Sequence, residues 1–130
     1  MKWVVVENDW YWKKIPEQFR KEMGFEVGWG NGYAIIPPTH PLAGKDYYEV
    51  SKHVRVHEGL TFGKRIGSDL IEAFKLDPEN IGSYIYGFDT CHYEDNIQKW
   101  PKEAVEAEAQ NLAEQLTLYA LNNERESERK

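Results

Sequence analysis

The feature that most constrains the fold is a long amphipathic segment near the C-terminus. It begins at Pro101 and runs to about Asn122. Its apolar side chains recur at alternating spacings of four and three residues, at Val105, Ala109, Leu112, Leu116 and Tyr119. This period is that of an α-helix with one apolar face, and proline is favoured at the first helical position. Because such a face has to be buried against another layer, the sequence predicts a long helix packed on the rest of the chain.

The chain before this helix divides into short segments that favour strands and turns. Aromatic and β-branched residues fill most of them, and stretches rich in glycine or proline separate them. The expected strands are residues 2–7, 25–29, 33–36, 50–56, 60–62 and 83–88, with hairpin turns at 31–32 and 58–59. The expected helices are residues 16–23 and 68–76, with one helical turn at 46–49. We therefore predict an α+β fold, a largely antiparallel sheet of about five or six strands with the long C-terminal helix packed on one face.

A chain of 130 residues is expected to form one domain. We place this single α+β domain at residues 1–123. Residues 124–130 alternate in charge and carry no apolar side chain, so we expect them to be a charged, frayed C-terminal tail.

Charge and cysteine content restrict the partners and the compartment. The net charge is −6 and every basic pair is diluted by neighbouring acids, so duplex nucleic acid is not an expected partner. No apolar run approaches the ~20 residues of a membrane helix, and the first residues lack the pattern of a signal peptide. The single cysteine, Cys91, cannot form an internal disulfide. These features indicate a cytoplasmic protein with no membrane partner.

The candidate site follows the aromatic strand at 83–88. The residues that come after this strand include Asp89, Thr90, Cys91, His92, Glu94 and Asp95. The end of a strand holds polar groups at a fixed point of a sheet's edge, so His57 could join this cluster from a neighbouring hairpin. Alternation along the strand sends Phe88 into the core and Asp89 to the opposite face. We therefore expect the Asp89 carboxylate to orient the His57 ring.

Three kinds of chemistry fit these residues. Two imidazoles and a carboxylate are ligands for zinc or iron, but the spacing of His57, Asp89 and His92 matches no named metal motif. Cys91 could be a nucleophile with a histidine as base, although the flanking acids disfavour its thiolate. The third is the binding of a small ligand, in which polar groups give specificity and aromatic faces stack on a base or a sugar.

The ligand-binding interpretation rests on the aromatic content, which is 14% of the chain, and on glycines that allow the backbone to approach a ligand closely. The predicted ligand-binding residues are His57, Thr61, Asp89, Thr90, His92, Trp29, Tyr33 and Tyr47. No catalytic residue is assigned, and neither a metal nor a cofactor is expected.

Many of these residues belong to a pattern that covers residues 29–118. Its parts are Gly32-Tyr33, Ile36-Pro37, His40-Pro41, Gly44-Lys45, Tyr47, Val56-His57, Gly59-Leu60-Thr61-Phe62, Gly87-Phe88-Asp89-Thr90, His92, Asp95, Val105-Glu106, Leu112-Ala113 and Gln115-Leu116. In this pattern the chain resembles a small family of uncharacterised phage and prophage accessory proteins. It departs from the family at Glu58, where a second glycine is usual, and at Tyr48-Glu49, where two aspartates are usual.

The resemblance implies a viral setting in the host cytoplasm more than it implies an activity. Small phage proteins of this kind often antagonise bacterial immunity. We therefore expect a non-enzymatic phage protein that counters host defence by binding or sequestering a small nucleotide-like signalling ligand. One alternative is a protein–protein inhibitor that covers a basic groove of a host defence effector with its acidic surface. A second alternative is a metal-dependent hydrolase that uses His57, Asp89 and His92. A homo-oligomer is compatible with all three.

Overall fold

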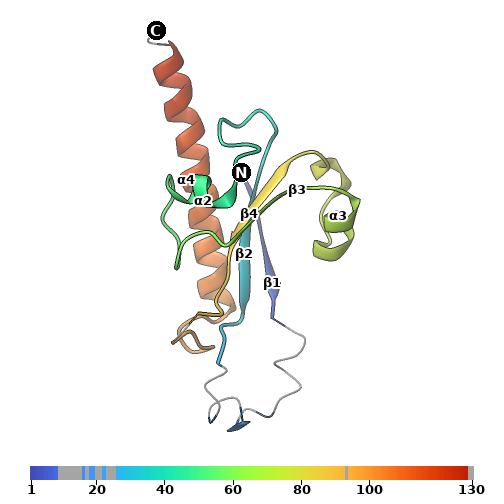
Figure 1. Cartoon of the computed structure of the whole chain (residues 1–130), viewed down its shortest axis with the longest axis vertical. Coiled ribbons are helices and arrows are strands. Elements are labelled where there is room, and N and C mark those ends of the chain that lie inside the picture. Colours follow the sequence, from blue (N-terminus) through green and yellow to red (C-terminus); the bar gives the residue numbers. More distant parts are fainter. Residues whose placement is uncertain (9–15, 17, 20–21, 23–25, 93, 129–130) are drawn as a thin grey trace.

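The computed structural model describes residues 1–8, 16, 18–19, 22, 26–92 and 94–128 (Figure 1). Four strands form one antiparallel sheet, namely β1 (Lys2–Glu7), β2 (Gly30–Ile36), β3 (Phe62–Arg65) and β4 (Tyr84–Phe88). Between and after them come the helices α2 (Tyr47–Ser51), α3 (Ser68–Phe74) and α4 (Lys102–Glu128), and the 3₁₀ helix η2 (Pro78–Asn80). The α+β class and the long C-terminal helix are confirmed. The prediction of five or six strands was too high for the part of the chain that the structure describes.

The strand order across the sheet is β1-β2-β4-β3, so β2 and β4 are the central strands. Their register places Ala34 opposite Tyr86 and Gly32 opposite Phe88. Both central strands are buried along most of their length. This explains why residues 33–36 of β2 and most of β4 are aromatic or aliphatic, whereas a strand with one solvent-exposed face alternates.

The predicted hairpin turn at 31–32 is wrong, because β2 begins at Gly30 and continues through these residues. Gly32 serves packing at this point. A Cβ atom on Gly32 would lie 2.5 Å from the Cζ atom of Phe88, which occupies the space above the glycine backbone. A glycine within a strand often marks such a close approach, and the sequence alone does not distinguish it from a turn glycine.

The expected strand at 50–56 is also wrong. The helical turn expected at 46–49 is confirmed and continues as α2, whose Val50 is fully buried. Val54 lies in the coil that follows α2, and it is buried while His53 and Arg55 on either side are exposed. This produces an alternation in the sequence that mimics a strand. Of the expected strand at 60–62, only Phe62 belongs to β3.

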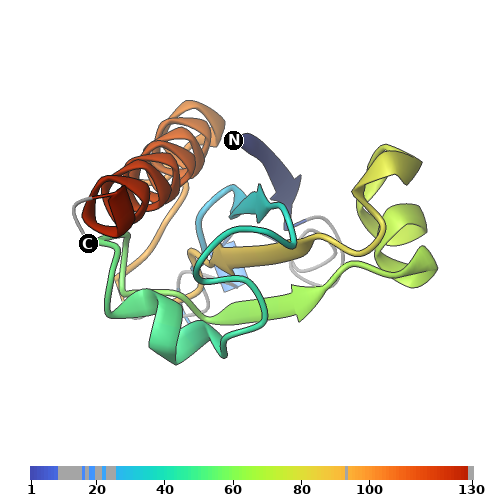
Figure 2. The same cartoon turned by 90° about the horizontal axis from the view of Figure 1, so that it is seen from above.

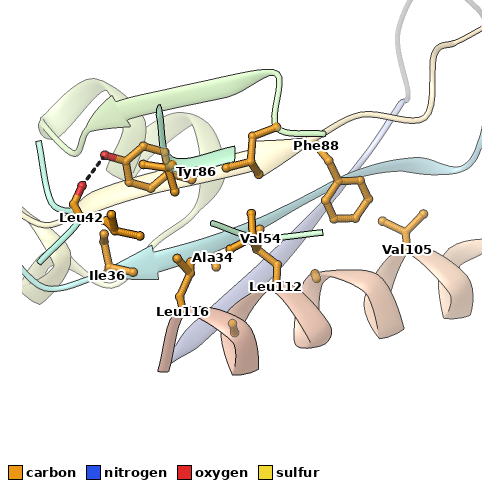
Figure 3. Packing of buried hydrophobic residues seen from close by; sticks show 13 residues of the cluster. Ala34, Ile36, Leu42, Val54, Tyr86, Phe88, Val105, Leu112 and Leu116 are labelled. Atoms are coloured by element: carbon orange, nitrogen blue, oxygen red, sulfur yellow. Dashed lines mark hydrogen bonds between the residues drawn. The ribbon is translucent and has the colours of Figure 1, made fainter. Parts of the chain in front are cut away.

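Alternation along the strands produces two hydrophobic clusters, one on each face of the sheet. The cluster under α4 includes Ala34, Ile36, Tyr86, Phe88, Val105, Ala109, Leu112 and Leu116 (Figure 3). The cluster on the opposite face joins Tyr33, Ile35 and Ile85 to Ile66, Leu70 and Leu76, and α3 lies on that side (Figure 2). Full burial of a side chain such as Leu112 contributes about 1.5–3 kcal/mol, and the cluster under α4 has more buried members than the cluster on the opposite face.

The helix α4 is longer than expected. It begins at Lys102, after Pro101, and continues to Glu128, past the expected end at about Asn122. Its first turns cover β2 and β1, and its last turns project beyond the sheet (Figure 1). Of the helix expected at 16–23, residues 17, 20–21 and 23 lie outside the described residues. None of the described helices is both long enough and apolar enough to span a membrane.

Buried polar contacts hold the proline-rich loop after β2 against the core. His40 is 5% exposed. Its Nδ1 atom accepts a hydrogen bond from the Leu42 N–H at 3.0 Å, and its Nε2 atom donates to the Leu116 carbonyl of α4 at 2.8 Å. The Tyr86 hydroxyl donates to the Lys45 carbonyl at 2.6 Å and also lies 3.3 Å from the Leu42 carbonyl (Figure 3). This pattern requires a neutral His40 ring with its proton on Nε2.

Candidate functional site

The chain turns sharply at the end of β4, and three hydrogen bonds fix the turn. The fully buried Thr90 donates its hydroxyl to the Gly30 carbonyl at 2.7 Å, and the Thr90 carbonyl accepts from the Gly28 N–H at 2.7 Å. Asp89 Oδ1 accepts from the Cys91 N–H at 3.0 Å. The segment that follows therefore begins from a rigid point of the sheet, as the sequence predicts.

Asp95 links this segment to the loop that carries His57. Its Oδ1 atom lies 2.8 Å from Nε2 of His57, and its Oδ2 atom accepts from the His92 N–H at 2.9 Å. The Asp95 residue is only 5% exposed. A buried carboxylate with a hydrogen bond to each oxygen is well satisfied. Asp95 therefore sets the orientation of the His57 ring through Nε2.

A row of polar residues on α4 positions the backbone of the His57 loop. Gln115 accepts from the Arg55 N–H at 2.8 Å through Oε1 and donates to the Arg55 carbonyl at 2.8 Å through Nε2. Glu108 Oε2 accepts from the His57 N–H at 3.1 Å, and Asn111 donates to Glu108 Oε1 at 2.8 Å. These side chains recur every three or four residues, so they lie along one side of the helix next to its buried face.

The His57 ring lies against two other rings. Its centroid is 4.3 Å from that of Trp100, at an interplanar angle of 39°, and 5.6 Å from that of His92, at 80°. Trp100 precedes α4, and the centroid of its ring also lies 6.4 Å from that of Phe88. Segments that are far apart in the sequence therefore bring two imidazoles and an indole together at one end of the sheet.

His92 Nε2 is buried and has no hydrogen-bond partner among the described residues. Asp89 Oδ1 lies 3.1 Å from it, but the two groups are not aligned as a hydrogen bond, and Oδ1 already accepts from the Cys91 N–H. The other Asp89 oxygen, Oδ2, has no hydrogen-bond partner within the described ranges. Buried polar atoms are nearly always satisfied by protein, water or ligand, so His92 Nε2 marks a position for a bound group, with the partly exposed Asp89 carboxylate beside it.

The predicted pairing of Asp89 with His57 is wrong. Asp95 holds His57, and Asp89 lies beside His92. The prediction extended strand alternation through Asp89, but β4 ends at Phe88 and the turn after it redirects the next side chains. The His57 and His92 rings nevertheless lie together, and Asp89 lies beside His92.

The other predicted ligand-binding residues lie on several different elements. Trp29 is half-buried and lies near the site, since its N–H donates to the Trp100 carbonyl at 2.8 Å. The Thr90 hydroxyl is already hydrogen-bonded to the Gly30 carbonyl. Tyr33 is 7% exposed and lies on the face of the sheet that carries α3. Thr61 pairs through its backbone with Gly87. Tyr47 is 40% exposed on α2, where its ring contacts Tyr48.

Cys91 is not prepared to act as a nucleophile. Burial, with the nearby carboxylates of Asp89 and Asp95, raises the pKa of its thiol above the ordinary value. The thiolate is the reactive form of cysteine, so this environment disfavours the nucleophilic alternative.

The described residues also contain no group of three or more histidine, cysteine, aspartate or glutamate side chains arranged to hold a metal ion. His57 and His92 are close, but each lies next to its own carboxylate through Nε2. Nothing in this arrangement favours the metal-dependent hydrolase.

The sequence did not single out Trp100 or Glu108 for the site, and it presented Asp95 only as one of several acids after the strand. Trp100 could have been suspected because it directly precedes the proline that starts the helix, where a side chain is held in place. Glu108, Asn111 and Gln115 form a polar row beside the apolar stripe, which is visible in the sequence. The partner of this row is the backbone of a distant loop, and the sequence does not reveal that contact.

Comparisons with known proteins do not identify the chain. No protein-family model matches it, and the searches of curated proteins and of solved structures found no match.

Proposed function

We propose that this chain is a phage-encoded protein that counters bacterial host defence by binding a small nucleotide-like signalling ligand, and that His57, His92 and Asp89 form the binding site. The observation that carries the proposal is the buried Nε2 atom of His92, which lacks a hydrogen-bond partner in the described structure. The phage setting comes from the sequence pattern, and the site chemistry supports the class of ligand.

The chemistry of the site fits a nucleobase better than it fits a phosphate. Carboxylates surround the imidazoles, and they repel an anion but accept hydrogen bonds from amino and imino groups. Asp89 Oδ2 is available to accept from such a group, and His92 Nε2 can bond the neighbouring ring atom. The rings of His57 and Trp100 provide flat surfaces of the kind on which bases stack.

The phosphates of such a ligand would need cations outside this group of residues. Arg55 precedes His57 by two residues and is exposed. Lys102 Nζ lies 5.6 Å from the centre of the Trp29 ring, close to Trp100. One or two cations are enough for a small anionic group, so the acidic balance of the chain does not argue against the proposal.

Calorimetric titration tests the proposal with ADP-ribose, cyclic AMP and cyclic di-AMP as probes. We expect at least one of them to bind, and its inosine counterpart to bind more weakly, because hypoxanthine lacks the amino group that Asp89 would accept from. The His92→Ala variant should not bind, whereas the Tyr47→Ala variant, which lies on a distant element, should bind normally. Absence of heat with every probe would contradict the proposal.

A second candidate is the inhibitor of a host defence effector. It is favoured by the exposed carboxylates along α4, which include Glu103, Glu114, Glu124, Glu126 and Glu128. This candidate predicts binding to a basic protein that weakens as salt is added, because exposed charges are screened. It also predicts that His92→Ala has no effect, and that result separates it from the first proposal.

A further inference from the structure

The outer side of α4 carries two leucines that solvent reaches. Leu118 is 57% exposed and Leu121 is 45% exposed. Glu114 and Arg125 flank them at the same spacing and are also exposed. At about 100° per residue, these four positions fall within about 60° of one another, on the side opposite Val105 and the rest of the buried face. We call the four residues the outer stripe.

The described structure leaves the outer stripe uncovered. The last turns of α4 project beyond the sheet, and no described helix or strand lies on their outer side (Figures 1 and 2). A groove of about 520 Å³ adjoins the stripe, between α4 and the edge strand β1, and Met1, Trp3, Thr117 and Leu118 contribute to its wall. Met1 and Trp3 in this wall extend the exposed apolar surface that Leu118 and Leu121 form.

We propose that the outer stripe binds a second copy of this chain, with the two α4 helices antiparallel. The stripe is complementary to itself in that orientation and in no other. Pairing Leu118 with the partner's Leu121 also pairs Glu114 with the partner's Arg125, and a two-fold axis repeats both contacts. A parallel pair would instead place each charge against its own copy, which is repulsive.

The groove enlarges the surface available to the partner. A pair of helices in contact along the stripe alone would bury less than the roughly 1,200–2,000 Å² of a standard interface. Side chains from the end of the partner's α4 can enter the groove beside β1 and add to this area. Since the core of the contact is small, we expect a dimer that dissociates on dilution.

Sedimentation velocity over a wide range of protein concentration tests this arrangement. The wild-type chain should convert from monomer to dimer as concentration rises. Each single reversal, Glu114→Arg or Arg125→Glu, should raise the dissociation constant by roughly tenfold, because two symmetry-related contacts change sign at once. The combined reversal should restore the wild-type constant. Leu121→Asp should remain monomeric.

Two controls keep the result specific. Glu126→Arg makes the same change of charge on another side of the helix and should leave the dissociation constant unchanged. Far-ultraviolet circular dichroism of each diluted variant should match that of the wild type, because none of the substituted side chains is buried. A wild-type chain that stays monomeric at every concentration, or a combined reversal that fails to restore association, would overturn the proposal.

Discussion

At the scale of single residues, His40 is expected to make stability depend on pH. Burial lowers the pKa of this ring below its ordinary value of 6.5, and the Leu116 carbonyl opposes that shift only in part. The unfolded chain therefore binds a proton more readily than the folded one. The contribution of His40 to stability is complete above pH 6.5 and is lost as the pH falls through its lower folded-state pKa.

Urea unfolding of the wild type and of His40→Gln at a series of pH values measures this effect. The variant should be less stable at neutral pH, because it loses the two bonds of the neutral ring. The difference in the free energy of unfolding between the two proteins should shrink as the medium becomes acidic. A difference that is independent of pH would show that His40 does not titrate in this way.

The two acids of the site are expected to have different roles. Asp95→Asn removes the charge of a buried carboxylate that bonds His57 and the His92 backbone, so it should cost about 1–3 kcal/mol of stability and also weaken ligand binding. Asp89→Asn replaces a partly exposed acid with a residue that can still accept from the Cys91 N–H. It should leave the melting temperature nearly unchanged and abolish ligand binding. Thermal melts beside a ligand titration separate the two, and an earlier melt for Asp89→Asn than for Asp95→Asn would contradict this assignment.

At the scale of elements, β4 and α4 are joined through Phe88. This ring is 1% exposed and belongs to the cluster under α4. Phe88→Ala should therefore cost roughly 3–5 kcal/mol, the usual cost of truncating a buried ring. Ile97→Ala is the matched control, since Ile97 is 52% exposed and should lose little. Chemical denaturation of both variants checks the contrast, which fails if the two losses are similar.

The polar row on α4 is expected to support the site from a distance. Gln115→Ala removes both bonds to the Arg55 backbone and should reduce stability by only about 1 kcal/mol. The His57 loop is then held less firmly. The free energy of ligand binding should therefore weaken by more than the free energy of unfolding does. Gln110→Ala, at an exposed position outside the row, should change neither quantity. Equal ligand affinity in the wild type and in Gln115→Ala would show that the row is not needed by the site.

At the scale of the whole molecule, the sequence predicts what depends on local periodicity and misses what depends on packing between distant segments. The period of the C-terminal stripe predicted α4 and its buried face, and the aromatic run predicted β4. Gly32 was assigned to a turn because nothing local reveals that Phe88 occupies the space of its side chain. Asp95 was underestimated for the same reason, since its partner His57 lies 38 residues away.

The most direct test of the account is whether a bound ligand forms a hydrogen bond with the Nε2 atom of His92. Long-range ¹H–¹⁵N spectra report the protonation and hydrogen bonding of histidine side chains, and this chain has four. On addition of ADP-ribose or of whichever probe gives heat, the ring signals of His92 and His57 should shift. Those of His40, which is bonded at both nitrogens, and of His53, which lies against Tyr119, should stay unchanged. A ligand that binds without moving the His92 and His57 signals would contradict the proposed site.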